Sequence, residues 1–143
     1  MIRKLLLAFG LIVLPAFAYG ETLLPKKLSQ EEIAAAVDAR KTVDQSAEGY
    51  KDIIINRSAD QAFESGIFVS GPTRAEASAP GGYGNDEFMY FISGEATLTS
   101  ADGSTTTVRA GEGMTVPKGW VGVFETKGYT KLYVAYYGQK AEQ

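Results

Sequence analysis

The pattern of apolar and polar positions divides the 143-residue chain into three parts. Residues 1–18 place two basic side chains before an apolar run. Residues 19–64 are more polar and contain one amphipathic stretch. From residue 65 to 138, short apolar and β-branched runs alternate with turns that contain glycine. This pattern predicts a leader, an N-terminal extension and one body domain.

The leader has the order of a secretory signal peptide. Arg3 and Lys4 precede the apolar run, which ends in Ala16-Phe17-Ala18, a small-x-small cleavage site. The run from Leu5 to Ala18 is about 14 residues long, whereas a membrane-spanning helix needs about 20. We therefore expect cleavage after Ala18, a periplasmic or secreted protein, and no stable membrane anchor in the mature chain.

The N-terminal extension predicts one short helix and one edge strand. Ser29 and Glu32 have the spacing of a capping box, which typically opens a helix. Apolar residues four apart follow, so we expect a helix from about Gln30 to Lys41. The β-branched run Ile53-Ile54-Ile55 is typical of a strand, and we place it at the edge of a sheet.

The body domain predicts many short strands. In chain order they are 67–69, 73–77, 88–92, 96–99, 105–109, 111–116, 121–126 and 132–137. Asp102-Gly103 between two β-prone runs indicates a hairpin, and we expect further turns at Gly94 and at Lys127-Gly128. Short strands with frequent turns favour a sandwich or barrel over a parallel α/β sheet.

Composition excludes several kinds of chemistry. The chain has no histidine and no cysteine, so histidine metal sites, Ser-His-Asp triads, disulfides and thiolate nucleophiles are ruled out. Its net charge is −3, and the calculated pI is near 5.0. We therefore expect no nucleic-acid partner.

Two segments resemble the motifs of the cupin superfamily. Six residues separate Glu87 from Gly94, and residues 111–119 end in Pro117-Lys118-Gly119. The stretch from Pro117 to Gly122, followed by residues 131–134, looks like the small subfamily that includes ureidoglycine aminohydrolase. The resemblance covers about residues 65–138. It implies an all-β fold, a double-stranded β-helix or cupin jelly-roll barrel, preceded here by a short N-terminal helix.

The metal-binding histidines of that superfamily are missing. Their positions fall on Gly81 and Tyr83, or one residue earlier, and on Gly122, so only Glu87 of the family's ligand set remains. We expect a metal-free domain without a cofactor, because transition-metal sites usually assemble three or four ligands. A hard cation held by oxygen atoms of residues 85–87 is the alternative.

Strand alternation predicts a ligand pocket inside the barrel. Its expected lining is aromatic with one carboxylate: Tyr83, Glu87, Met89, Phe91, Trp120 and Phe124. The glycine at position 122 is expected to leave room beside them. A carboxylate in such surroundings needs a partner, for which Tyr83 and Arg74 are candidates. Met89, Phe91 and Phe124 also fit a plain core role, because small barrels are filled by side chains.

Two functions from different classes fit these residues. The first is an exported binding domain that holds a small polar or planar metabolite between Trp120 and Phe124. The alternative is a small-molecule enzyme, amidohydrolase-like or isomerase-like, with Glu87 and Tyr83 as acid and base. The missing histidines count against the aminohydrolase version, because the resemblance implies that this chemistry uses a metal, and we rank the binding domain first.

An apolar stripe of Phe88, Tyr90 and Ile92 is expected on the outer face of the barrel. Large exposed apolar patches are uncommon on monomers, so the stripe needs a cover. Either a second copy of the chain, in a homodimer, or the helix from Gln30 to Lys41 would supply it.

The leader generates the first prediction. The exported protein should begin at or near Tyr19, since signal peptidase cleaves after the Ala-x-Ala site. Intact-mass analysis of the exported protein measures this directly. Soluble protein that retains residues 1–18 would contradict it.

Overall fold

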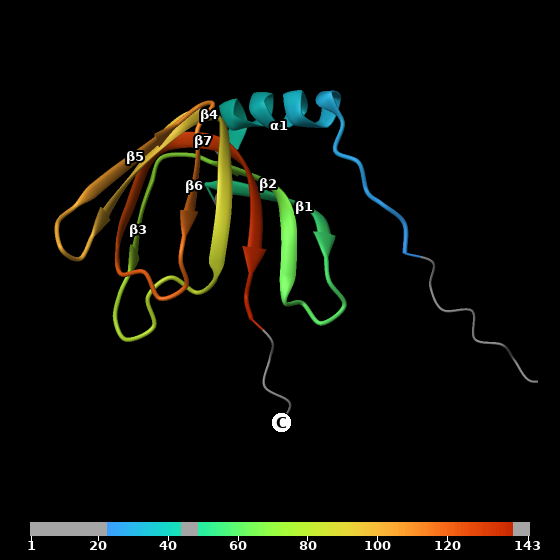
Figure 1. The fold of residues 1–143 in the computed structure, drawn as a ribbon. Coiled ribbons are helices and arrows are strands. Elements are labelled where there is room, and N and C mark those ends of the chain that lie inside the picture. The colour runs from blue at the N-terminus through green and yellow to red at the C-terminus, as the bar shows by residue number, and fades with distance from the viewer. Residues whose placement is uncertain (1–22, 44–48, 139–143) are drawn as a thin grey trace, which may run out of the picture.

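The computed structural model describes residues 23–43 and 49–138 (Figure 1). The leader predicted at residues 1–18 lies outside this part. A single helix, α1 (Gln30–Val43), precedes the strands. These are β1 (Tyr50–Arg57), β2 (Phe63–Ser70), β3 (Thr73–Ala77), β4 (Asp86–Ser100), β5 (Thr105–Arg109), β6 (Gly113–Val116) and β7 (Gly122–Tyr136). No helix in the described ranges is long and apolar enough to cross a membrane.

The antiparallel strands form a jelly roll because β4 and β7 take part in both of its layers. The first half of β4 pairs with the second half of β7, next to β2, β1 and β6. The other halves pair with each other, next to β3 and β5. In Figure 1 the β3 and β5 side and the β1 and β2 side spread apart from a common bend. This confirms the predicted all-β jelly roll with a short N-terminal helix.

Two glycines allow β4 and β7 to bend without ending. Gly94 has φ +76° and Gly128 has φ +116°, a region that side chains disfavour. A Cβ atom on Gly94 would collide with the carbonyl oxygen of Gly128, so the two backbones touch at the bend. The expected chain turns at Gly94 and Lys127-Gly128 were therefore wrong, because both positions are bends within continuous strands. The turn at Asp102-Gly103 does form the predicted hairpin between β4 and β5.

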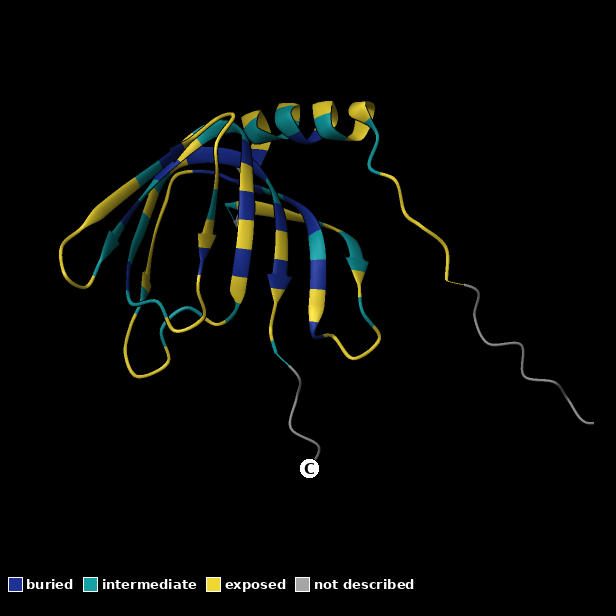
Figure 2. Ribbon diagram, viewed as in Figure 1, coloured by how far each residue is buried: buried dark blue, intermediate teal, exposed yellow. Residues whose placement is uncertain are grey.

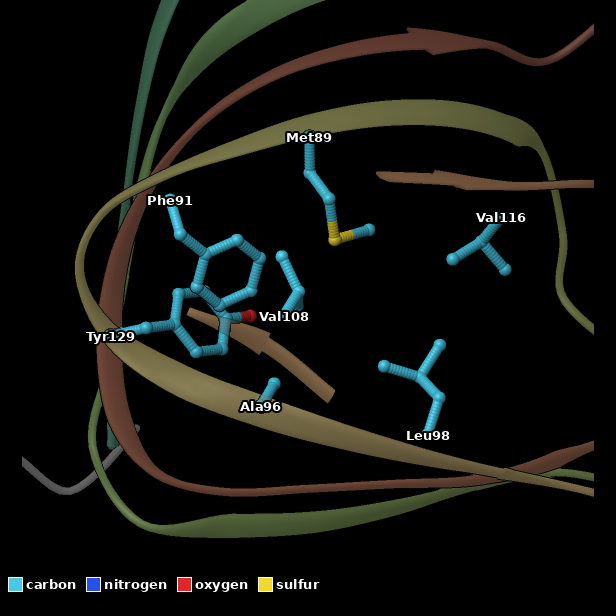
Figure 3. Close-up of a cluster of buried hydrophobic side chains, with 7 residues drawn as sticks. All are labelled: Met89, Phe91, Ala96, Leu98, Val108, Val116 and Tyr129. Carbon is cyan, nitrogen blue, oxygen red and sulfur yellow. The ribbon is translucent and has the colours of Figure 1, made fainter. Parts of the chain in front are cut away.

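Apolar side chains fill the space between the two layers (Figure 3). The buried set is Met89, Phe91, Ala96, Leu98, Val108, Val116 and Tyr129. The rings of Phe91 and Tyr129 lie 4.9 Å apart, centroid to centroid, near the bend. Met89 and Phe91 are fully buried here, which is the core role that small barrels require.

Helix α1 begins at the predicted capping box. The Ser29 hydroxyl and backbone N–H both donate to Glu32 Oε2 at 2.7 Å, and the Glu32 N–H donates to Ser29 Oγ at 3.2 Å. The buried face of the helix packs against Ile67 and Val69 of β2. Strand β1 is the edge of the sheet, as the isoleucine run predicts.

The outer stripe on β4 is not covered by the helix. Helix α1 packs on β2 and β7, whereas Phe88 and Tyr90 are 50% and 41% exposed. Figure 2 shows the resulting alternation of buried and exposed positions along β4. A homodimer through this face stays a prediction.

The bend generates the second prediction. Gly94→Ala should destabilise the fold by about 1–2 kcal/mol from the positive φ, plus about 1–3 kcal/mol from overpacking against Gly128. Gly103→Ala is the matched control, since its φ is +84° but a Cβ there meets nothing within 4 Å. Urea unfolding measures both variants. Equal losses would show that the close approach of Gly94 and Gly128 does not matter.

Candidate ligand-binding site

A buried ion pair joins the two long strands in the interior. Lys131 Nζ of β7 lies 2.5 Å from Glu87 Oε1 of β4, and the two side chains are 7% and 9% exposed. The other oxygen, Oε2, accepts from the Tyr83 hydroxyl at 2.5 Å and from Asn85 Nδ2 at 3.5 Å. Both carboxylate oxygens of Glu87 are therefore engaged. Tyr83 is a partner as predicted, but the cation is Lys131, because Arg74 lies at the surface.

Three aromatic rings surround the Lys131 ammonium. Its Nζ lies 5.5 Å from the centroid of Phe68, 5.6 Å from Tyr129 and 5.9 Å from Tyr133. At these distances the ring faces attract the cation. An ammonium group carries three N–H donors, and within the described residues only Glu87 accepts a hydrogen bond from it. The remaining donor capacity is available to a bound molecule.

A cavity of about 320 Å³ opens beside Lys131. Its wall is rich in aromatic rings, and its lining is Gly49, Tyr50, Phe68, Ser70, Pro72, Thr73, Ala75, Tyr83, Phe124, Tyr129 and Lys131. The volume falls within the range of small-molecule sites, about 300–1,000 Å³. Glu87 lies behind Lys131 and does not line the cavity.

The six predicted site residues do not all meet in this cavity. Tyr83 and Phe124 line it, whereas Met89 and Phe91 belong to the core between the layers. Trp120 lines a separate depression of about 120 Å³, where its indole N–H donates to Ser100 Oγ at 3.1 Å. Trp120 and Phe124 therefore do not form two walls of one pocket.

The expected space beside Gly122 is absent. A Cβ atom at this position would collide with the Trp120 ring and with the carbonyl oxygen of Thr99. The indole occupies the volume that a side chain at position 122 would take. The glycine thus accommodates Trp120 and leaves no ligand space.

The sequence reasoning missed Lys131. Strand alternation along β7 puts Tyr129, Lys131 and Tyr133 on one face, and both tyrosines are aromatic residues expected to point inward. A lysine between two inward tyrosines, on a strand beside an inward glutamate, was the available signal. Phe68 pairs with Lys131 across β2 and β7 and completes the group.

A second polar network lies on the same inner face. The Tyr133 hydroxyl lies 2.9 Å from Asp52 Oδ1 and 2.8 Å from Glu64 Oε1, and Arg57 forms an ion pair with Glu64 at 2.5 Å. A phenol has one proton, so it donates to only one of the two carboxyl groups. The contact with the second carboxyl group is a hydrogen bond only when that group is protonated and donates to the phenol oxygen.

The pKa of Asp52 is raised by its surroundings in this network. Burial, with the nearby charge of Glu64, raises the pKa of Asp52 above its ordinary value of 3.8, although the Tyr133 hydrogen bond opposes the shift. Burial also raises the pKa of Tyr83 and of Tyr133, and the carboxylates beside them add to it. Both phenols therefore act as donors at neutral pH.

The acidic residues do not gather as metal ligands would. Over residues 23–43 and 49–138, no three or more acidic, histidine or cysteine side chains lie close enough to hold a metal ion. Asp86 Oδ1 instead accepts the backbone N–H of Lys118 at 3.0 Å, while Glu87 faces Lys131. A domain without a metal stays a prediction, which elemental analysis tests.

Two antiparallel layers that share two bent strands form a jelly roll, an architecture that includes the cupins. Residues 57–133 match the EutQ-like cupin domain, and the chain belongs to that family. Among curated proteins, none matches the sequence.

Solved structures agree with this fold. EutQ from Clostridium difficile superposes with a TM-score of 0.50 at 20% identity, over 61% of this chain and 67% of that chain. A protein of unknown function from Rhizobium leguminosarum gives a TM-score of 0.57 at 20% identity, over 81% of this chain and 100% of that chain. A protein of unknown function from Pseudomonas syringae gives 0.53 at 21% identity, over 60% of this chain and 35% of that chain. At these identities the likeness establishes the fold alone.

The Asp52 network generates the third prediction. Folded protein holds the Asp52 proton to higher pH than unfolded protein, so the contribution of Asp52 to stability is lost as pH rises above about 3.8. In Asp52→Asn the amide donates to Tyr133 at every pH. The variant should therefore gain stability relative to wild type between about pH 3.5 and pH 7.

Asp60→Asn is the control of opposite sign. Hydrogen bonds from Ser58 and from the Ala62 N–H lower the pKa of Asp60. Its replacement should therefore lose stability relative to wild type as pH rises toward and through about 3.8, because the stability contributed by Asp60 is lost below that pH. Urea unfolding at several pH values measures both variants. If the unfolding free energy of Asp52→Asn changes with pH in the same way as that of wild type, the raised pKa of Asp52 is contradicted.

Proposed function

We propose that this EutQ-like cupin binds a small molecule in the cavity beside Lys131. The observation that supports the proposal is a buried ammonium with unused hydrogen-bond donors on the wall of an aromatic cavity of about 320 Å³. Buried polar groups nearly always have their hydrogen bonds satisfied. A ligand oxygen, or a water molecule when no ligand is bound, would accept a hydrogen bond from the remaining donors of the Lys131 ammonium.

The surroundings of Lys131 suit recognition. Its ion pair with Glu87 and the three rings hold the ammonium in place, so binding requires little ordering of this long side chain. Phe68, Phe124 and Tyr129 offer rigid apolar surface. A ligand would gain burial from the rings and orientation from the ammonium, the usual division of roles in small-molecule sites.

The predicted leader gives this proposal a location. A cleaved signal peptide would put the binding domain in the periplasm or outside the cell, where it would meet its ligand. The mature domain would need neither a cofactor nor a nucleic-acid partner.

An enzyme that uses Glu87 and Tyr83 as acid and base is the second candidate. It is the amidohydrolase-like or isomerase-like alternative of the sequence analysis. The hydrogen-bonded series Tyr83, Glu87 and Lys131 beside the cavity favours it, because it links three groups that can carry protons. Glu87 does not line the cavity, so Lys131 or Tyr83 would first have to move aside for a substrate to reach it. Binding requires no such rearrangement, and we rank it first.

The fourth prediction tests binding at this site. A thermal-shift screen against small metabolites should yield ligands that raise the melting temperature of wild type. Mass action gives about 2.7 kcal/mol of stabilisation at a ligand concentration 100 times the dissociation constant, which is a shift of several degrees for a domain of this size. The double variant Lys131→Met/Glu87→Gln removes both charges together and should lose the response.

Arg74→Met/Glu125→Gln is the matched control. It removes an ion pair of similar chemistry, 3.3 Å long, from the surface of the neighbouring layer. In this control variant, the ligands should raise the melting temperature by as much as they do in wild type. Ligands that stabilise all three proteins equally would overturn the site. A ligand that wild type converts and Glu87→Gln does not would favour the enzyme.

A further inference from the structure

Two ion pairs lie on or at the edge of the inner face of this cupin. Lys131 pairs with Glu87, and Arg57 pairs with Glu64. The remaining carboxyl group, Asp52, shares the Tyr133 phenol with Glu64, and the single phenol proton cannot serve both contacts. Asp52 is exposed on the edge strand β1 and does not line the cavity, so the charges that a ligand meets there are those of Lys131 and the Glu87 behind it.

This charge pattern restricts the ligand. A carboxylate at Lys131 would add a second negative charge next to the buried Glu87, and burying a charge without its own partner is strongly unfavourable. A cationic ligand would be repelled by the positive charge of the Lys131 ammonium. A neutral molecule avoids both penalties.

The donors and the walls restrict it further. The ammonium carries donors only, so the ligand atom beside it must be an acceptor. The lining presents the rings of Tyr50, Phe68, Tyr83, Phe124 and Tyr129. Flat unsaturated molecules contact such walls over most of their surface, since aromatic pairs stack or meet edge to face.

We propose that the ligand is a neutral, planar molecule that presents a carbonyl oxygen to the Lys131 ammonium. This inference rests on the proposed function and specifies its ligand class. Ketones, aldehydes, amides and lactones on a flat unsaturated frame belong to the class. The hydrogen bond to a charged donor supplies orientation, and the rings supply contact area.

Two probes of the same shape test the carbonyl requirement. Acetophenone carries C=O where α-methylstyrene carries C=CH₂, so the pair differs at the atom that would face Lys131. NMR titration of wild type should give acetophenone a dissociation constant at least about 10-fold lower, because a hydrogen bond to a charged group contributes roughly 1.5–3 kcal/mol. In Lys131→Met/Glu87→Gln the difference should disappear. Arg74→Met/Glu125→Gln should retain it.

Benzoate tests the charge requirement. It has the same ring and a charged carboxylate, and it should bind wild type more weakly than acetophenone. Tighter binding of benzoate, or equal binding of acetophenone and α-methylstyrene, would overturn the ligand class. If the metabolite screen nevertheless yields ligands that depend on Lys131 and Glu87, the binding function stands and only the class is wrong. If neither probes nor metabolites depend on these residues, the binding function at this site falls as well.

Discussion

The burial of the Lys131 ammonium beside Glu87 is the interaction on which the candidate site depends. Taking both charges out of water is unfavourable, and a single hydrogen bond would not offset it. Glu87 is held in turn by Tyr83, and Lys131 by three ring faces. These contacts fix the ammonium at the cavity wall with donors to spare. Removal of either the Lys131 or the Glu87 charge would leave the other charge buried without a partner.

The bend at Gly94 and Gly128 makes this arrangement possible. Because β4 and β7 continue through the bend, one strand supplies both Phe124 and Lys131 to the same cavity. The first half of β4 lies beside the second half of β7, which brings Glu87 close to Lys131. A true chain turn at either glycine would separate these groups. The local backbone freedom of two residues therefore determines the chemistry of the cavity.

Local signals in the sequence predicted local structure well. The Ser29–Glu32 capping box located the start of the helix, and Asp102-Gly103 located the hairpin, because both depend on neighbouring residues alone. Glycines at 94 and 128 were misread as turns, because a positive φ serves a turn and a bend equally. The overall jelly roll followed from the order of motifs.

The candidate site was only partly predictable, because it depends on contacts between distant strands. Glu87 and its partner Tyr83 lie four residues apart, and the sequence indicated them. Lys131 is 44 residues from Glu87, and a lone charge in a strand usually points to solvent. Trp120 turned toward Gly122 instead of the cavity, a side-chain choice that strand alternation does not specify.

A double-mutant cycle on Lys131 and Glu87 tests the central claim most directly. The measurement is the free energy of urea unfolding for Lys131→Met, Glu87→Gln, the double variant and wild type. A buried ion pair predicts that each single variant loses about 3–5 kcal/mol, while the double variant loses far less than the sum. Single losses that add within about 0.5 kcal/mol would show that the two groups do not interact, and would contradict the account.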